Sequence, residues 1–361
     1  NVGRVWLWGY GCPKEKVSDR CHRQVKGDKS PTEHHQSFAG HAGTDTWCKH
    51  HFYFRPTGES LKVSIRGLGT IGNAEPLYLI DAFAVTSQPE PCRHRKYRHL
   101  EGCRFRFYYG AQAANGVIII TTKRAKKGET RVDFDMSLIA DLSMWFDMLN
   151  ADEWGQVYWS AYKYANNGAT PSSEIYGNGA TPQLQDYIGL NGAKVHAVDT
   201  DWRDVVYRTA LMQNYIATLS KGSDNGAFCS VEYLDHDGLV ENTNFQRINT
   251  RISSNYHYLD NRLRIGENVA INRWTQTLSP AGVDENAIKQ HPAKTVYDEN
   301  GNYNDAINDV LGDAPNMARL LENEKQNKHD YWRIFGNAFL EIEPIKNLVL
   351  KTNFGMNYYD E

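Results

Sequence analysis

The chain contains 361 residues and has a formal net charge of −3, from 40 basic and 43 acidic side chains. This length can hold two domains with a sizeable core, and the near-neutral charge gives no sign of a nucleic-acid partner. The sequence has no run of about 18 apolar residues, so we do not expect a transmembrane helix.

Two stretches in the first third of the chain read as one interrupted motif. The first contains Val63-Ser64-Ile65-Arg66-Gly67 and continues at Pro76-Leu77-Tyr78-Leu79-Ile80-Asp81, and the second runs from Tyr109-Gly110 through Asn115-Gly116 to Lys123. Together they resemble the plug of a TonB-dependent outer-membrane receptor, and more narrowly the SusC/RagA-like branch with its IRG, PLYVIDG and ANGVILITTK motifs. The positions that carry this plug signature are Arg66, Gly67, Asp81, Gly110, Asn115 and Gly116.

Residues 92–108 do not fit the resemblance, because they form a basic run where the family has an acidic and aliphatic one. A shifted reading frame explains the difference. Codons for the family-like segment DIESIDILKDAASASIYG, read one base out of frame, encode RHRKYRHLEGCRFRFY, which is residues 93–108 of this chain. Similar slips account for parts of the amino-terminal region. We therefore interpret residues 1–58 and 86–108 as frame-shifted text and expect them to be poorly packed.

The cysteines and histidines of this region invite two other interpretations. Cys48-Lys49-His50-His51 and Cys21-His22 could suggest a zinc site, but their spacing matches no four-ligand pattern, and we predict no metal site. The basic and aromatic run from Arg93 to Phe107 could suggest a nucleic-acid patch. The frame shift explains both the many cysteines and histidines and the basic, aromatic run, so we expect neither zinc binding nor nucleic-acid binding.

Beyond Gly128 the pattern changes to strict alternation. Val132, Phe134, Met136 and Leu138 alternate with charged or small polar residues, which is typical of a strand with two different faces. Six further strands are predicted at 213–222, 227–236, 245–258, 262–275, 331–343 and 347–359. The connections between the seven strands alternate between long and short. This parity is typical of outer-membrane barrels, which have short periplasmic turns and longer extracellular loops.

The first long connection is predicted to contain a helix. Asn150 can cap its first turn, and Glu153 can complete a capping box. Asp152 and Glu153 could alternatively form a catalytic carboxylate pair, but neighbouring residues of a helix point in different directions. His236, between two aspartates, could bind a metal, but we expect it at a loop tip, and Asp298 to Asn302 is expected to be a turn rather than a calcium loop. No catalytic residues are predicted.

Three kinds of side chain are candidates for function. Arg66 and Asp81 could lock the plug to the barrel wall by bidentate hydrogen bonds, or could form a salt bridge inside the plug. The 21 tyrosines and 9 tryptophans could stack on glycans, although interfacial girdles of a barrel explain most of them. Trp154, Trp159 and Trp202 lie in the first long connection, away from any girdle, and are candidates for substrate or partner contact.

The resemblance implies an α+β plug domain at residues 1–127, followed at 128–361 by antiparallel strands that form the amino-terminal part of a transmembrane β-barrel. Seven strands leave the barrel incomplete, so we expect a fragment, which begins at Asn1 without an export signal. The resemblance implies import of oligosaccharides or peptides into a Bacteroidota-like, Gram-negative bacterium, with TonB, a SusD-like surface lipoprotein and outer-membrane lipid as partners. It implies neither an enzyme nor a cofactor. A non-functional fragment and a soluble carbohydrate-binding β-protein remain alternatives.

Overall fold

A computed structural model describes most of the carboxy-terminal two thirds of the chain. Backbone and side chains are described for residues 130–142, 147–189, 192–222, 225–306 and 310–361, and also for 76–80, 115, 117 and 118. For seven short strand segments only the backbone is described, at residues 6–8, 22–26, 48–51, 62–65, 83–85, 94–100 and 119–122.

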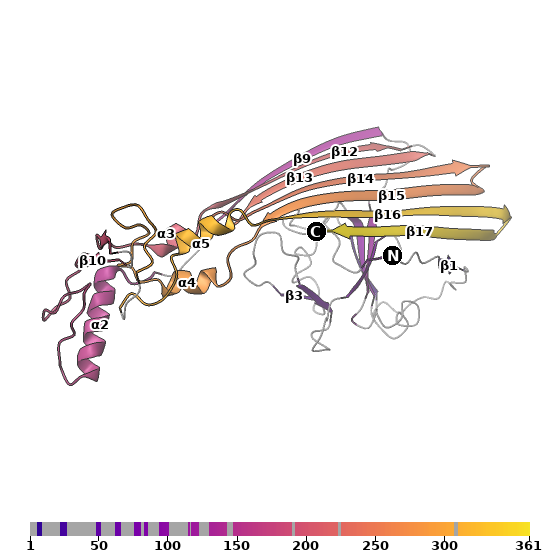
Figure 1. The fold of residues 1–361 in the computed structure, drawn as a ribbon. Helices are drawn as coiled ribbons and strands as arrows, with labels where there is room; N and C mark the ends of the chain where they lie inside the picture. Colours follow the sequence, from indigo (N-terminus) through magenta and orange to yellow (C-terminus); the bar gives the residue numbers. More distant parts are fainter. Residues whose placement is uncertain are drawn as a thin grey trace.

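A large antiparallel sheet dominates the molecule (Figure 1). Seven long strands lie side by side in chain order, each hydrogen-bonded to the next long strand, and β1 (Trp6–Trp8) adds a short segment beside the last of them. The seven strands are β9 (Thr130–Asp141), β12 (Ala210–Lys221), β13 (Gly226–Asp237), β14 (Asn244–Tyr258), β15 (Leu263–Thr277), β16 (Lys328–Ile345) and β17 (Leu348–Asp360). The sheet is curved and does not close into a ring, because β9 lies at one edge and β17 lies near the other.

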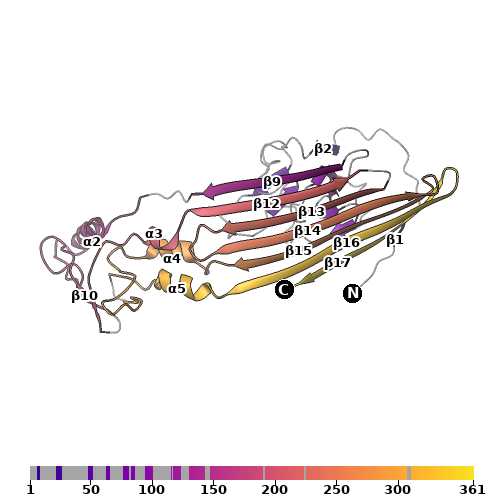
Figure 2. The same ribbon diagram turned by 90° about the horizontal axis from the view of Figure 1, so that it is seen from above.

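The seven strands lie where the alternating pattern predicts them, and their ends differ from the predicted ranges by at most three residues. Short turns join β12 to β13, β14 to β15 and β16 to β17 at one end of the sheet (Figure 2). Asn347 takes a left-handed conformation (φ 69°) in the tightest of these turns, as asparagine does more readily than most residues. The fold-class prediction of an α+β chain with an antiparallel, unclosed sheet is therefore confirmed.

A smaller five-stranded sheet lies on the concave side of the large one (Figure 1). Its strand order is β2 (His22–Lys26), β7 (His94–Leu100), β8 (Val117–Thr122), β5 (Leu77–Ile80) and β6 (Phe83–Val85). β8 is central, pairs in parallel with β5, and buries Val117 and Ile118 completely, as its β-branched run predicts. A separate antiparallel pair joins β3 (Cys48–His51) to β4 (Lys62–Ile65).

The frame-shift interpretation falls largely outside the described residues. Within 1–58 and 86–108 only strand backbones are described, and β7 is one of them. The side-chain packing of these segments, which carries the prediction, lies outside the described residues. The boundary between the two domains near residue 127 likewise stays a prediction.

The two long connections fold together at the end of the sheet opposite the short turns (Figures 1 and 2). We call the described residues of 147–209 and 278–327 the loop lobe. It contains α2 (Ala151–Ala165), α3 (Trp202–Val206), α4 (Val283–Lys289), α5 (Met317–Glu324) and a short hairpin of β10 (Tyr187–Ile188) and β11 (Lys194–Val195). No helix in the described part of the chain has the length and apolar character needed to cross a membrane.

Candidate functional site

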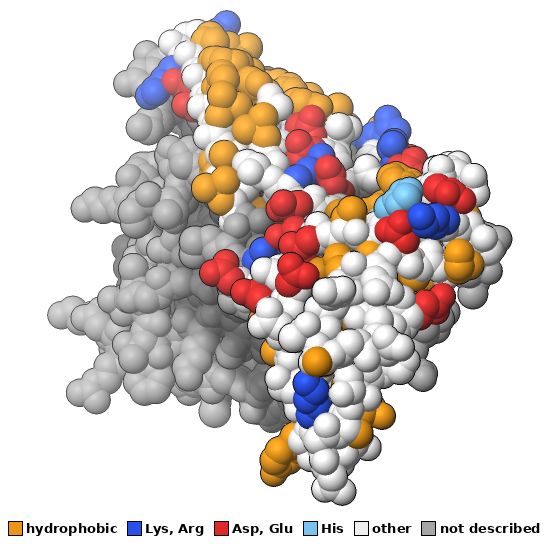
Figure 3. Space-filling model, turned by 90° about the vertical axis from the view of Figure 1, so that its left-hand side faces the viewer, with side chains coloured by type: hydrophobic (Ala, Val, Ile, Leu, Met, Phe, Trp, Pro, Cys, Tyr) orange, Lys and Arg blue, Asp and Glu red, His pale blue; other side chains and the backbone are white. Residues whose placement is uncertain are grey.

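One face of the large sheet is apolar and exposed. The apolar side chains of β9, from Val132 to Leu138, are 53–74% exposed. The strand register carries the same face across the sheet, so that one cross-strand row contains Val132, Leu219, Cys229, Ile252 and Val269. Figure 3 shows hydrophobic side chains gathered over this convex side. An apolar surface of this extent needs an apolar environment or a partner.

Aromatic side chains mark both borders of the apolar face. At the border near the loop lobe, one cross-strand row contains Met136, Tyr215, Tyr233, Ile248, Arg273 and Trp332, and the next row towards the lobe is mostly polar. At the opposite border, Tyr256 and Tyr258 of β14 stack with ring centroids 6.4 Å apart. The eight to ten residues of β14 between the borders, tilted by about 40°, give a height of roughly 20–26 Å. This height matches the apolar band of about 25 Å of a transmembrane barrel.

The opposite, concave face of the sheet is polar. One cross-strand row on this face contains Glu232, Asn249, Asn272 and Arg333, and these four side chains are all buried. Glu232 accepts hydrogen bonds from Arg247 Nη2 (3.4 Å) and Asn249 Nδ2 (3.3 Å). Arg251 Nε donates to Asn268 Oδ1 (2.9 Å). A polar inner wall behind an apolar outer wall is the arrangement of a barrel with a polar interior.

Helix α2 of the loop lobe begins with the predicted capping box. The Glu153 backbone N–H donates to Asn150 Oδ1 (2.8 Å), and the Asn150 N–H donates to Glu153 Oε2 (3.1 Å). Glu153 therefore satisfies orphan backbone groups at the helix terminus. Because this carboxylate is committed to the cap, the geometry favours the capping interpretation of Asp152-Glu153 over a catalytic pair.

The three candidate tryptophans lie in or against the cores of the loop lobe. Trp159 is 2% exposed and donates its indole N–H to Gly179 O (3.1 Å), and Trp202 is 3% exposed and donates to His291 O (3.2 Å). Trp154 is half-buried and stacks on Tyr158 at 5.4 Å. The folded lobe thus gives each tryptophan a packing role, and only Trp154 keeps substantial surface for a ligand.

Two ionisable side chains are buried where the helices of the lobe meet. His291 lies edge-on to Trp154 at 4.1 Å, and its Nδ1 accepts a hydrogen bond from the Ala293 N–H (3.0 Å). Burial lowers the pKa of His291 to about 4. Lys294 is completely buried, donates from Nζ to Ala314 O (2.8 Å), and has a pKa lowered by the same desolvation. Both side chains are buried and bond to backbone groups of the lobe, so they have a structural role and do not form an accessible reactive site.

Most of the plug signature lies outside the described residues: Arg66, Gly67, Asp81, Gly110 and Gly116. Asn115 is described and lies in a turn directly before β8. The side chains of the zinc candidates at 21–22 and 48–51 also lie outside the described part. The plug-barrel lock therefore stays a prediction.

The remaining candidates have structural partners. His236 lies in β13 rather than at a loop tip, and its Nε2 is 3.2 Å from Asp141 Oδ2 of β9. Asp298 Oδ1 accepts hydrogen bonds from the Asn300 and Asn302 backbone N–H groups (2.9 Å each), which closes the predicted turn. Among the described residues, no three metal-ligating side chains converge.

Sequence reasoning missed the junction between the lobe and the sheet. Arg208 lies just before β12 and donates to backbone carbonyls of the connection between β13 and β14. No pattern in the sequence indicated what this arginine contacts. The long connections also contain α4 and α5, for which no helix was predicted.

Comparison with known proteins gives relatives at the sequence level, although no family model matches. The chain is 30% identical to TonB-dependent receptor P3 of Formosa agariphila in an alignment of 315 positions that covers 83% of this chain and 28% of that protein. It is 24% identical to TonB-dependent receptor SusC of Bacteroides thetaiotaomicron over 314 residues, covering 76% of this chain and 28% of that protein. The chain thus spans a little over a quarter of the length of these relatives.

Solved structures share the fold. The RagAB peptide importer in its open-open state superposes with a TM-score of 0.73 at 21% identity, covering 98% of this chain and 42% of the importer chain. Its closed-closed state gives a TM-score of 0.72 at 20% identity, covering 93% and 40%. The superposition includes the large sheet and extends over nearly the whole chain.

Proposed function

This chain is part of a SusC/RagA-like TonB-dependent receptor of the outer membrane, and we propose that the whole receptor imports oligosaccharides or peptides through a barrel of which the large sheet is one wall. The observation that carries the proposal is the two-faced sheet, with an exposed apolar face whose borders carry aromatic side chains and a buried polar face. A wall of this kind separates lipid from a polar interior. The expectation of a receptor rather than an enzyme agrees with the relatives, which are named as receptors and importers.

The two domains take the roles that the resemblance implies. Residues 1–127 are proposed as the plug and residues 128–361 as the first part of the barrel. The smaller sheet on the concave side, with β8 at its centre and β5 beside it, supports this division. Arg66 and Asp81 are proposed to lock the plug to the wall, and Arg66→Ala in an intact receptor should then make the outer membrane leak.

The proposed partners are TonB, which pulls on a segment before the plug, and a SusD-like lipoprotein, which closes over the barrel from outside. The loop lobe supports the second partner, because it is a folded platform at the end of the wall opposite the short turns. Trp154 is the best placed of the three tryptophans to contact such a partner or a substrate. The name of the RagAB peptide importer supports peptides as cargo, and the resemblance to the SusC branch keeps oligosaccharides open.

The two alternatives differ in how the structure bears on them. A soluble carbohydrate-binding β-protein would have to keep the apolar convex face in water, which disfavours that class. A non-functional fragment remains compatible with the family. Resequencing the coding region with both flanks decides this point, because reading-frame slips that persist would mark a broken gene.

Uptake by the host bacterium tests the proposed import. The gene for the intact receptor is deleted, and uptake of labelled oligosaccharide mixtures and of labelled peptide mixtures is compared with that of a complemented strain. We expect uptake of one class to fall and to be restored only when TonB is present. Unchanged uptake of both classes, or uptake restored without TonB, would contradict the proposal.

A further inference from the structure

The connection between β13 and β14 packs against the loop lobe and contributes to one of its cores. Val240, at its tip, is 6% exposed and packs in the same core as Trp202, Val206 and Met317 of the lobe. The lobe core therefore includes a residue from the rim of the sheet as well as residues from the two long connections.

Backbone hydrogen bonds fix the same junction. The Arg208 N–H donates to Leu239 O and the Glu241 N–H donates to Val206 O, both at 2.8 Å. Tyr207 and Val240 form an isolated antiparallel bridge between these two bonds. The chain that leaves α3 is thus paired with the rim turn before it enters β12.

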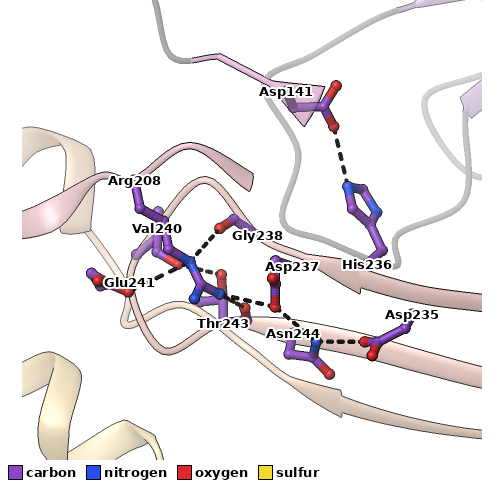
Figure 4. A network of polar contacts seen from close by, with 10 residues as sticks. All are labelled: Asp141, Arg208, Asp235, His236, Asp237, Gly238, Val240, Glu241, Thr243 and Asn244. Carbon is purple, nitrogen blue, oxygen red and sulfur yellow. Dashed lines mark hydrogen bonds and ion pairs between the residues drawn. The ribbon is translucent and has the colours of Figure 1, made fainter. Parts of the chain in front are cut away.

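The side chain of Arg208 crosses this junction (Figure 4). Its Nε donates to Gly238 O (3.1 Å), and its Nη2 donates to Thr243 O (2.8 Å) and to Asp237 Oδ1 (3.3 Å). Glu241 Oε2 lies 3.5 Å from Nε. The two carbonyl acceptors lie on opposite sides of the turn, so the rigid fork of a guanidinium can hold both at once, which a lysine ammonium cannot match.

We propose that Arg208 clamps the loop lobe to the rim of the sheet, so that the lobe and strands β12 to β14 move as one rigid body. We call Arg208 together with the turn 238–243 the rim clamp. A partner seated on the lobe then moves the wall directly, and only this consequence rests on the proposed function. The route to the inner face is short, because Asp237, which accepts a hydrogen bond from Arg208, adjoins His236, which contacts Asp141 on the concave side.

Hydrogen exchange of the intact, purified receptor tests the rim clamp. Three variants are compared with wild type: Arg208→Gln, Arg208→Lys, and the matched control Arg262→Gln in the turn between β14 and β15. Three sets of amides are followed: those of the clamp at 206–210 and 238–243, and Thr200, whose N–H donates to Pro292 O (2.8 Å) inside the lobe.

We expect Arg208→Gln to speed exchange of the clamp amides at least about tenfold, because charged hydrogen bonds to buried carbonyls are lost. Thr200 should keep its protection, Arg208→Lys should resemble Arg208→Gln within about threefold, and Arg262→Gln should have no effect. Unchanged exchange rates of the clamp amides in Arg208→Gln would overturn the proposal. Equally faster exchange of the Thr200 amide would also overturn it, because Arg208 would then support the whole lobe and not the junction. Wild-type exchange rates in Arg208→Lys would overturn it too, because a positive charge alone would then be sufficient.

This test is independent of transport. Exchange rates report the clamp in a receptor without partner or substrate, so a receptor that imports neither proposed cargo would still show the effect. Failure of the clamp and failure of the import proposal are therefore distinguishable.

Discussion

The buried His291 should make the loop lobe sensitive to acid. Its imidazole packs against the rings of Trp154 and Tyr176, and burial lowers its pKa from 6.5 to about 4. A depressed histidine pKa means that the unfolded lobe binds the proton more tightly. The stabilisation is therefore fully present above pH 6.5 and is lost as the pH falls towards 4. At 1.36 kcal/mol per pKa unit, about 3 kcal/mol is lost by pH 4.

Hydrogen exchange of the intact receptor between pH 7 and pH 4, corrected for intrinsic exchange rates, measures this loss. The Ala293 and Lys294 amides report the opening of the segment, because they donate to Nδ1 and to the carbonyl of His291. In His291→Gln the opening free energy should be nearly independent of pH over this range, whereas His257→Gln, in an exposed strand end, should behave as wild type. An equal pH dependence in wild type and His291→Gln would refute the reasoning.

Three further substitutions have direct expectations. Trp159→Ala removes a buried aromatic ring and its bond to Gly179 and should destabilise the lobe by about 3–5 kcal/mol, measured as faster amide exchange along α2. Asn150→Ala removes the capping box and should cost about 1 kcal/mol, visible as fraying of the first turn of α2 in the same experiment. Gly266→Ala places a Cβ against the Phe339 ring and should cost about 1–3 kcal/mol, measured as a lower temperature of barrel unfolding on gels.

The strands could be predicted because a wall with one apolar and one polar face imposes a period of two on the sequence. Val132 to Leu138 show that period clearly, and their exposure follows it. The cap at Asn150 was also a local signal, since it depends on a few neighbouring residues. Features that depend on the chemistry of neighbouring residues could therefore be predicted from the sequence.

The fold of the loop lobe could not be predicted from the sequence in the same way. Its core joins residues far apart in the chain, as when the Tyr187 hydroxyl donates to Ala293 O across 106 positions. The tryptophans suggested contact with a ligand because their connection was treated as an exposed loop. Trp159 and Trp202 are buried because the second long connection packs against them, and no local pattern in the sequence reveals that contact. The rim clamp of Arg208 depends on the same long-range pairing.

The convex face of the large sheet is assigned to the lipid, and one substitution tests this assignment. Ile252 is 51% exposed in the middle of the apolar face, and Val198 is 49% exposed on the loop lobe. In the intact receptor assembled in lipid, Ile252→Arg should cost about 2–4 kcal/mol of assembly, because the charge lies near the bilayer midplane. Val198→Arg should change stability by less than about 0.5 kcal/mol, as expected for a side chain in water. Equal assembly of both variants would contradict the assignment of the convex face to the membrane.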